Sequence, residues 1–185
     1  MIVLTAYIIF ISDNILREVI RFKNKAPVFN KGSHDQYSSY LTALFIYIVV
    51  LLPFFPFSKE GQIINTYLRI FGLLISFVGL LIHLHSLKIL GKYYTGMLKV
   101  STEQNIVKNG LYKWIRHPGY LGMMLLSIGF SIAIGHVFIV LLTSSLYILI
   151  YGYRIYVEEK MLTEHFGVEY IKYMKQTKRL IPFLF

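Results

Sequence analysis

The strongest pattern in the chain is a long stretch without charged residues. Residues 118–153 contain no Lys, Arg, Asp or Glu over 36 positions. As one helix this stretch would measure about 54 Å, whereas the hydrocarbon core of a bilayer is about 30 Å thick. Two shorter helices that turn near Gly135 and His136 fit that thickness better. The pattern therefore predicts a membrane hairpin whose two ends lie on the same side.

Three further apolar segments precede the hairpin. Residues 39–57 and about 66–87 each have the length of a membrane span. Residues 1–11 are also apolar, and this first helix either ends at the polar residues 12–14 or continues as an amphipathic helix to about residue 22. The predicted fold class is an all-α integral membrane protein with about five transmembrane helices, two of them forming the hairpin at 118–153.

The remaining segments complete a single domain. Residues 1–65 are expected to supply the N-terminal membrane helices, and residues 66–185 to form the core. Residues 88–116 are the longest polar stretch, but aromatic and aliphatic residues are interleaved in it. Because a long unstructured loop is uncommon in a compact protein, we expect this stretch to fold as a cap over the helix ends. A C-terminal helix follows the hairpin.

Composition and charge support a membrane protein. Apolar residues make up 56% of the chain and charged residues 15%, with a formal net charge of +10. Of nineteen Lys and Arg residues, seventeen lie in residues 17–31, 88–116 and 154–179. Such clustering between apolar spans is a topology signal and not a nucleic-acid surface, so we expect these segments on the cytoplasmic side. Attraction to anionic lipid is a sufficient explanation for most of the lysines.

Some chemistry is excluded or left open. The chain has no cysteine, which excludes disulfides and thiolate catalysis. His83 and His85 are two residues apart on a helix, so both cannot face one ligand. We expect no metal site, and a pocket lined by one of these two histidines is the more plausible role. Gly72, Ser76 and Gly79 form a small-residue face that packs within the chain or between chains, which leaves the oligomeric state open.

The start of the hairpin carries a candidate binding element. Pro118 suits the first position of a helix, which places His117 at the N-cap. The N–H groups near Gly119, Tyr120 and Leu121 are therefore candidates for holding an anion. The alternative is an interfacial turn in which Tyr120 is an aromatic anchor.

The far end of the hairpin carries a second candidate element. Arg154 and Glu158 are four residues apart and share a helix face. They form either a plain salt pair or a device for capturing a lipid head group. Glu158 and Glu159 are adjacent and point in different directions, so we expect one of them to bind a ligand while the other is solvated. The hairpin should bring Arg154 and Glu158 close to His117 and Tyr120.

Two ordered motifs carry a resemblance to a known family. The first is residues 110–122, GLYKWIRHPGYLG. The second comprises Glu158 and Glu159 with residues 165–167 (HFG), Tyr170, Tyr173 and residues 181–183 (IPF). Over roughly residues 66–185 the chain resembles the isoprenylcysteine carboxyl methyltransferase family, which are membrane enzymes that use S-adenosylmethionine.

The resemblance implies an activity and a site. It implies methyl transfer to a lipid-like acceptor, with a carboxylate favoured, and a cofactor site and C-terminus on the cytoplasmic side. Arg154 falls where the family has a substrate-binding arginine. The implied cofactor contacts are Gln104, Asn105, Ile106, Val107, Tyr112, His117, Pro118, Gly119, Tyr120 and Glu158. A carboxylate acceptor is already ionised and needs no base, whereas an amine or hydroxyl would need one, from His83, His85 or Glu159.

Two other functions remain alternatives. The closing segment, residues 180–185, and the element around His117 and Pro118 also resemble NADPH-dependent membrane lipid or steroid reductases. A non-catalytic membrane scaffold that binds lipid is the other alternative.

Overall fold

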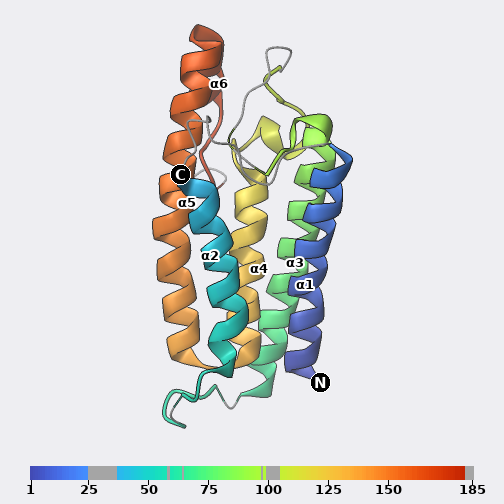
Figure 1. Cartoon of the computed structure of the whole chain (residues 1–185), viewed down its shortest axis with the longest axis vertical. Helices are drawn as coiled ribbons and strands as arrows, with labels where there is room; N and C mark the ends of the chain where they lie inside the picture. The colour runs from blue at the N-terminus through green and yellow to red at the C-terminus, as the bar shows by residue number, and fades with distance from the viewer. Residues whose placement is uncertain (25–36, 58, 64, 97, 99–104, 182–185) are drawn as a thin grey trace.

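The computed structural model describes residues 1–24, 37–57, 59–63, 65–96, 98 and 105–181. No β-strand is formed within these ranges. Five long helices run side by side along the long axis of the molecule (Figure 1), and a shorter sixth helix packs against the end of the fifth. The helices are α1 (Ile2–Lys23), α2 (Ser38–Leu51), α3 (Thr66–Leu90), α4 (Pro118–Ile134), α5 (Val137–Phe166) and α6 (Val168–Gln176), with short 3-10 helices η1 (Leu52–Phe54), η2 (Gly91–Tyr93) and η3 (Gly110–Lys113).

The predicted hairpin is confirmed as α4 and α5. The chain turns at Gly135, whose φ of 90° is a left-handed conformation that glycine adopts without strain. The ring of His136 then caps α5 by accepting a hydrogen bond from the Phe138 N–H at 3.2 Å. The helix does not end with the uncharged run, because α5 continues to Phe166. Its 30 residues measure about 45 Å, so its last turns, which carry Arg154 and Glu158, extend beyond a 30 Å hydrocarbon core.

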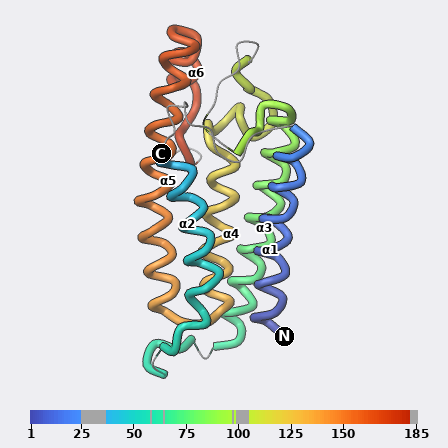
Figure 2. Tube along the Cα trace, in the orientation of Figure 1, coloured from blue at the N-terminus to red at the C-terminus, as the bar shows by residue number. Residues whose placement is uncertain are grey.

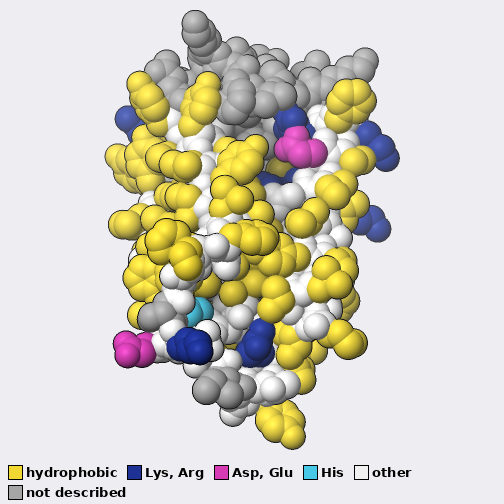
Figure 3. Space-filling view, turned by 60° about the horizontal axis from the view of Figure 1, so that its bottom comes forward, with side chains coloured by type: hydrophobic (Ala, Val, Ile, Leu, Met, Phe, Trp, Pro, Cys, Tyr) yellow, Lys and Arg dark blue, Asp and Glu magenta, His cyan; other side chains and the backbone are white. Residues whose placement is uncertain are grey.

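Two helical segments in the described part of the chain are long and apolar enough to cross a membrane, residues 66–93 and 137–166. Residues 38–54 and 118–134 form shorter apolar helices. The first helix, α1, continues to Lys23, which decides between the two lengths that its sequence allows. Hydrophobic side chains cover much of the bundle in the view of Figure 3, and exposed ones include Leu74, Leu141 and Ile148. The count of five membrane spans stays a prediction.

The small-residue face of α3 packs against α4 within the chain. A Cβ atom built at Gly79 would lie 2.7 Å from the Gly122 carbonyl oxygen, and one at Gly129 would lie 2.6 Å from the Gly72 carbonyl oxygen. Between them the Ser76 hydroxyl donates to the Leu126 carbonyl at 3.1 Å. The two helices run along each other in Figure 2. Their backbones approach so closely because no side chain separates them.

Replacing Gly79 with alanine is expected to destabilise the fold. The new methyl group would meet backbone atoms of α4, which cannot rotate away, and such overpacking costs about 1–3 kcal/mol. Gly152→Ala in α5 is the matched control, because a Cβ there meets no atom within 4 Å. Thermal unfolding in detergent should show a lower midpoint for Gly79→Ala and an unchanged or higher one for Gly152→Ala. Equal midpoints would contradict the close contact between α3 and α4.

The described residues between α3 and α4 lie at one end of the bundle (Figure 1), and the cap that the sequence predicts there stays a prediction. These residues include η2 and η3, and Leu98 and Tyr112 are buried. The same end carries α6 and the end of α5. The side of the membrane on which this end lies stays a prediction.

Candidate functional site

A cavity of about 160 Å³ opens at this end of the bundle, which is room for roughly ten water molecules. Helices α1 to α5 and the segment after η2 all contribute to its wall. Polar residues from distant parts of the chain meet there, among them Arg17, His83, His117, Tyr120, Arg154 and Glu158. Both ends of the hairpin thus contribute to one cavity, as the sequence predicts.

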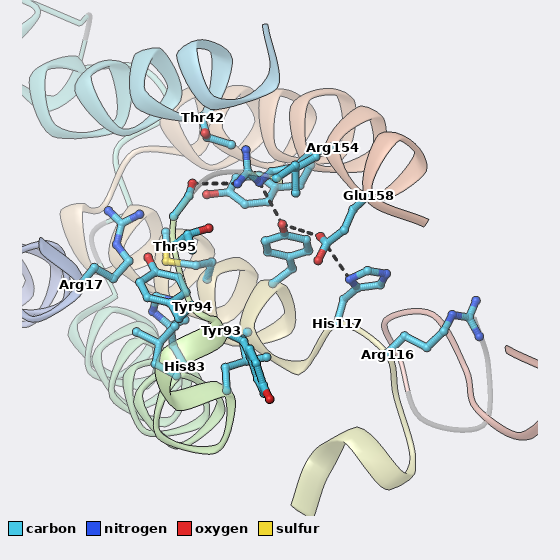
Figure 4. A pocket seen from close by; sticks show the side chains of 18 of the residues that line it. Arg17, Thr42, His83, Tyr93, Tyr94, Thr95, Arg116, His117, Arg154 and Glu158 are labelled. Atoms are coloured by element: carbon cyan, nitrogen blue, oxygen red, sulfur yellow. Dashed lines mark hydrogen bonds and ion pairs between the residues drawn. The ribbon is translucent and has the colours of Figure 1, made fainter. Parts of the chain in front are cut away.

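The Tyr120 hydroxyl joins the two predicted elements, of which Figure 4 labels His117, Arg154 and Glu158. It donates a hydrogen bond to Glu158 Oε2 at 2.7 Å and accepts one from Arg154 Nε at 2.9 Å. The His117 ring stacks on the Tyr120 ring, with centroids 5.4 Å apart and planes 9° from parallel. His117 Nδ1 also lies 3.6 Å from Glu158 Oε2. Tyr120 is therefore the central contact of the site and more than an aromatic anchor.

Arg154 is buried and holds three other segments of the chain in place. Its Nη1 donates to the Ser38 hydroxyl at the start of α2, at 2.8 Å. Its Nη2 donates to the Gly96 carbonyl at 2.9 Å, in the segment after η2. With its bond to Tyr120 in α4, one guanidinium connects α2, α4, α5 and the cap segment. This network fixes the position of its positive charge.

Glu159 is buried, so it is not a solvated member of the Glu158 and Glu159 pair. Its Oε1 accepts from Arg116 Nε at 2.7 Å and lies 3.2 Å from His117 Nε2. Its Oε2 accepts from Arg179 Nε at 3.0 Å. The segment around Lys178 runs alongside residues 114–117, where the Arg116 N–H donates to the Lys178 carbonyl at 2.8 Å. This pairing brings Arg179 to the Glu159 carboxylate. The buried Glu159 therefore anchors the C-terminal segment to the hairpin start.

The N-terminus of α4 differs in one respect from the prediction. Pro118 occupies the first helical turn and His117 the N-cap, as predicted. The Leu121 N–H, however, donates to the His117 carbonyl at 3.1 Å and is not available for an anion. A Cβ at Gly119 would meet only His83 and Ser86 atoms, at 3.8 Å, so packing does not demand glycine there. The missing side chain leaves room on the cavity wall.

The other predicted cofactor contacts fall into two groups. Tyr112 is buried, lines the cavity and has its carbonyl held by the Tyr173 hydroxyl at 2.6 Å. Burial, with Glu158 nearby, raises the pKa of Tyr112 above its usual range, so its phenol stays neutral. Asn105, Ile106 and Val107 are described but are not part of the cavity lining, and neither is Pro118. Gln104 lies outside the described residues.

A buried polar pair on the cavity wall was not predicted from the sequence. His83 Nδ1 lies 2.6 Å from Asp13 Oδ1, and both side chains are buried. His85 faces a separate recess beside Lys88 and Leu111. Asp13 itself indicates such a pair, because an acid within an otherwise apolar helix usually has a buried partner. Its partner could not be named from sequence, since α1 and α3 are separated by α2.

Comparisons with known proteins identify the family. The model of the isoprenylcysteine carboxyl methyltransferase (ICMT) family matches residues 71–164, which is half of the chain. The chain belongs to this family. The ICMT match covers α4 and nearly all of α5, and therefore includes Tyr120, Arg154 and Glu158.

Relatives of known name extend this match. Protein-S-isoprenylcysteine O-methyltransferase A of Arabidopsis thaliana is 28% identical over 116 residues, which are 62% of this chain and 59% of that protein. The Saccharomyces cerevisiae protein-S-isoprenylcysteine O-methyltransferase is 38% identical over 102 residues, which are 51% of this chain and 40% of the yeast protein. The chain thus spans about half the length of these relatives.

A solved structure of the ICMT family has the same fold. The structure of the eukaryotic intramembrane Ras methyltransferase ICMT matches with a TM-score of 0.60 and 25% identity, covering 83% of this chain and 55% of that one. With the two candidate spans, this likeness indicates an integral membrane protein. The predicted all-helical membrane fold is confirmed at this level.

Proposed function

We propose that the protein is a membrane methyltransferase that uses S-adenosylmethionine and methylates a lipid-like acceptor, with a carboxylate as the favoured group. The observation that carries this proposal is the Tyr120 hydroxyl, which joins Glu158 and Arg154 in one cavity at the end of the bundle. Family membership supports it, because the named relatives are O-methyltransferases of isoprenylcysteine. The chain spans about half the length of those relatives, so the complete activity is part of this proposal.

The residues of the cavity fit such a cofactor. S-adenosylmethionine supplies a methyl group on a positively charged sulfur. Glu158 faces the cavity with its side chain 24% exposed, and a carboxylate there suits a cationic ligand. The rings of Tyr112, His117 and Tyr120 offer faces for an adenine or a cation. Asn105, Ile106 and Val107 remain proposed contacts that rest on the resemblance alone, as does Gln104.

Arg154 is assigned to the acceptor. A carboxylate has a pKa near 4 and is ionised at neutral pH, so the protein needs to position it and not to deprotonate it. The planar guanidinium can hold a carboxylate through two parallel hydrogen bonds. Its present partners are the Gly96 carbonyl, hydroxyl groups of α2 and Tyr120. An acceptor carboxylate would replace some of these, so acceptor binding is expected to move the segment around Gly96.

The position of the cavity suits an acceptor with an apolar tail. Met123 and Tyr151, on α4 and α5, extend its wall toward the apolar part of the bundle. A tail in the bilayer would leave the head group at the end of α5 near Arg154. The basic segments at this end favour the cytoplasmic side, where a soluble cofactor is available. Neither a reductase nor a scaffold gains support from the family match.

The acceptor assignment is tested with two matched compounds. We expect purified protein in lipid nanodiscs to transfer a labelled methyl group to an S-prenylated cysteine with a free carboxylate. The same compound with a carboxamide should give no product, because a neutral amide neither pairs with Arg154 nor reacts as a nucleophile. Mass spectrometry of the extracted lipid measures both. Equal product from the two compounds, or methylation only of the amide, would overturn the carboxylate assignment.

A further inference from the structure

The pair of His83 and Asp13 has no role in methylating a carboxylate, yet it lies on the wall of the same cavity. Asp13 is fully buried in α1, and His83 is 4% exposed in α3. A buried carboxylate and imidazole are costly to desolvate, so a pair in an apolar bundle needs an explanation. The Arg17 Nε lies 3.5 Å from Asp13 Oδ2. Arg17 also lines the cavity.

Hydrogen bonding distinguishes the two ring nitrogens of His83. A carboxylate oxygen accepts hydrogen bonds, so the 2.6 Å contact has His83 Nδ1–H as the donor to Asp13 Oδ1. In the neutral ring Nε2 then keeps its lone pair. Nε2 lies on the opposite edge beside Cδ2, the atom that faces Gly119 on the cavity wall. Within the part of the chain that the structure describes, the hydrogen bond of the His83 ring is the one from Nδ1 to Asp13.

Neither other base candidate from the sequence has this arrangement. His85 faces the recess beside Leu111 and Lys88, away from the cavity. Glu159 is committed to Arg116, His117 and Arg179. Of these three candidates, His83 alone has a carboxylate on one ring nitrogen and also lines the cavity, the arrangement in which a carboxylate orients a histidine base. Asp13 and Arg17 are the charged groups beside it on α1.

We propose that His83 is a general base, positioned by Asp13, and that the cavity also methylates a lipid whose acceptor is a weakly acidic hydroxyl group. This inference rests on the proposed methyltransferase function. In the step, the hydroxyl oxygen forms the new O–C bond and its proton passes to His83 Nε2. The C–S bond of the donor breaks, and its electron pair stays on the sulfur as a neutral thioether. The proton then returns to water.

An imidazole base limits the acceptor to hydroxyl groups that are acidic enough to give it a proton. A neutral imidazole is a weak base, and a phenol, with a pKa of about 10, gives up its proton far more readily than a simple alcohol. A simple alcohol has a pKa closer to that of water, about 15.7, and is too weak an acid for this base. The acceptor class is therefore a lipid with a phenol-like hydroxyl. Its apolar tail would occupy the same space as the tail of a carboxylate acceptor.

The test compares two acceptors with the same alkyl tail, one ending in a phenol and one in a carboxylate. His83→Gln keeps a donor for Asp13 but removes the base. It should lower the turnover of the phenol by about 10²–10⁴-fold, while carboxylate methylation and S-adenosylmethionine affinity stay near wild type. Asp13→Asn, which frees the ring to exchange its tautomers, should show the same selective loss. His85→Gln, in the separate recess, is the matched control and should change neither reaction.

A second measurement needs no cofactor. A long-chain alkyl nitrophenol should bind wild type as the coloured phenolate with His83 protonated, and should bind His83→Gln mainly as the colourless phenol at the same pH. Equal loss of both reactions in His83→Gln, or an unchanged spectrum, would assign the pair a structural role only. Carboxylate methylation without any phenol methylation by wild type would overturn this inference and leave the proposed function intact. No cofactor binding at all would overturn both.

Discussion

Replacing Glu159 with alanine is expected to cause the largest loss of stability of any single substitution in the site. The Glu159 carboxylate is 6% exposed and pairs with Arg116, which is 8% exposed. Removing it leaves the Arg116 guanidinium buried without its carboxylate, and breaking such a pair costs about 3–5 kcal/mol. The bond to Arg179 is lost as well, so the C-terminal segment should loosen from the start of α4. Thermal unfolding in detergent at a fixed scan rate measures the loss.

The neighbouring Glu158 is the matched control. Its carboxylate is partly exposed on the cavity wall and bonds to the Tyr120 hydroxyl. We expect Glu158→Ala to unfold close to the wild-type midpoint, because a hydroxyl can turn to another partner or to water. Limited proteolysis near the C-terminus should be faster only in Glu159→Ala. Similar midpoints for the two variants would mean that Glu159 does not anchor the fold.

Replacing Arg154 with lysine is expected to abolish most acceptor methylation although the charge is kept. An ammonium group cannot make the planar set of bonds to Tyr120, the α2 hydroxyl and the Gly96 carbonyl that fixes the guanidinium. A misplaced acceptor loses roughly a hundredfold in rate, and we expect that loss in kcat/KM for the acceptor. Steady-state kinetics with varied acceptor, at saturating S-adenosylmethionine, measures it.

Two controls separate this effect from a general one. Lys160→Ala, on the exposed side of the same helix, should retain wild-type kinetics. Binding of S-adenosylmethionine to Arg154→Lys should stay within a few-fold of wild type, roughly 1 kcal/mol or less, because Arg154 is assigned to the acceptor. A variant that loses cofactor binding and acceptor use together would contradict the division of roles between Arg154 and Glu158.

Much of the site could be predicted because the membrane restricts the fold. An uncharged run too long for one span must turn, and the turn brings Tyr120 close to Arg154 and Glu158 in space. A close helix contact on α3 was predicted from Gly72, Ser76 and Gly79 at helical spacing, whereas its partner α4 was not. These predictions needed only length, periodicity and charge.

The features that sequence did not predict depend on contacts between distant segments. Glu158 and Glu159 are adjacent, and nothing local decides which of them faces the cavity. That choice depends on the return of the C-terminal segment, which brings Arg179 to Glu159. Likewise, the partner of Asp13 lies on α3, and no spacing within α1 indicates His83. Packing of whole helices, rather than any motif, determines these pairs.

The most direct test of the account is calorimetric titration of the purified protein in nanodiscs with S-adenosylmethionine and, separately, with NADPH. We predict one binding site for S-adenosylmethionine and no heat with NADPH. Glu158→Ala should bind at least about tenfold more weakly, a change of 1.4 kcal/mol. Glu164→Ala, an exposed carboxylate on the same helix, should bind like wild type. Binding of NADPH without S-adenosylmethionine, or equal affinities in Glu158→Ala and wild type, would contradict the account.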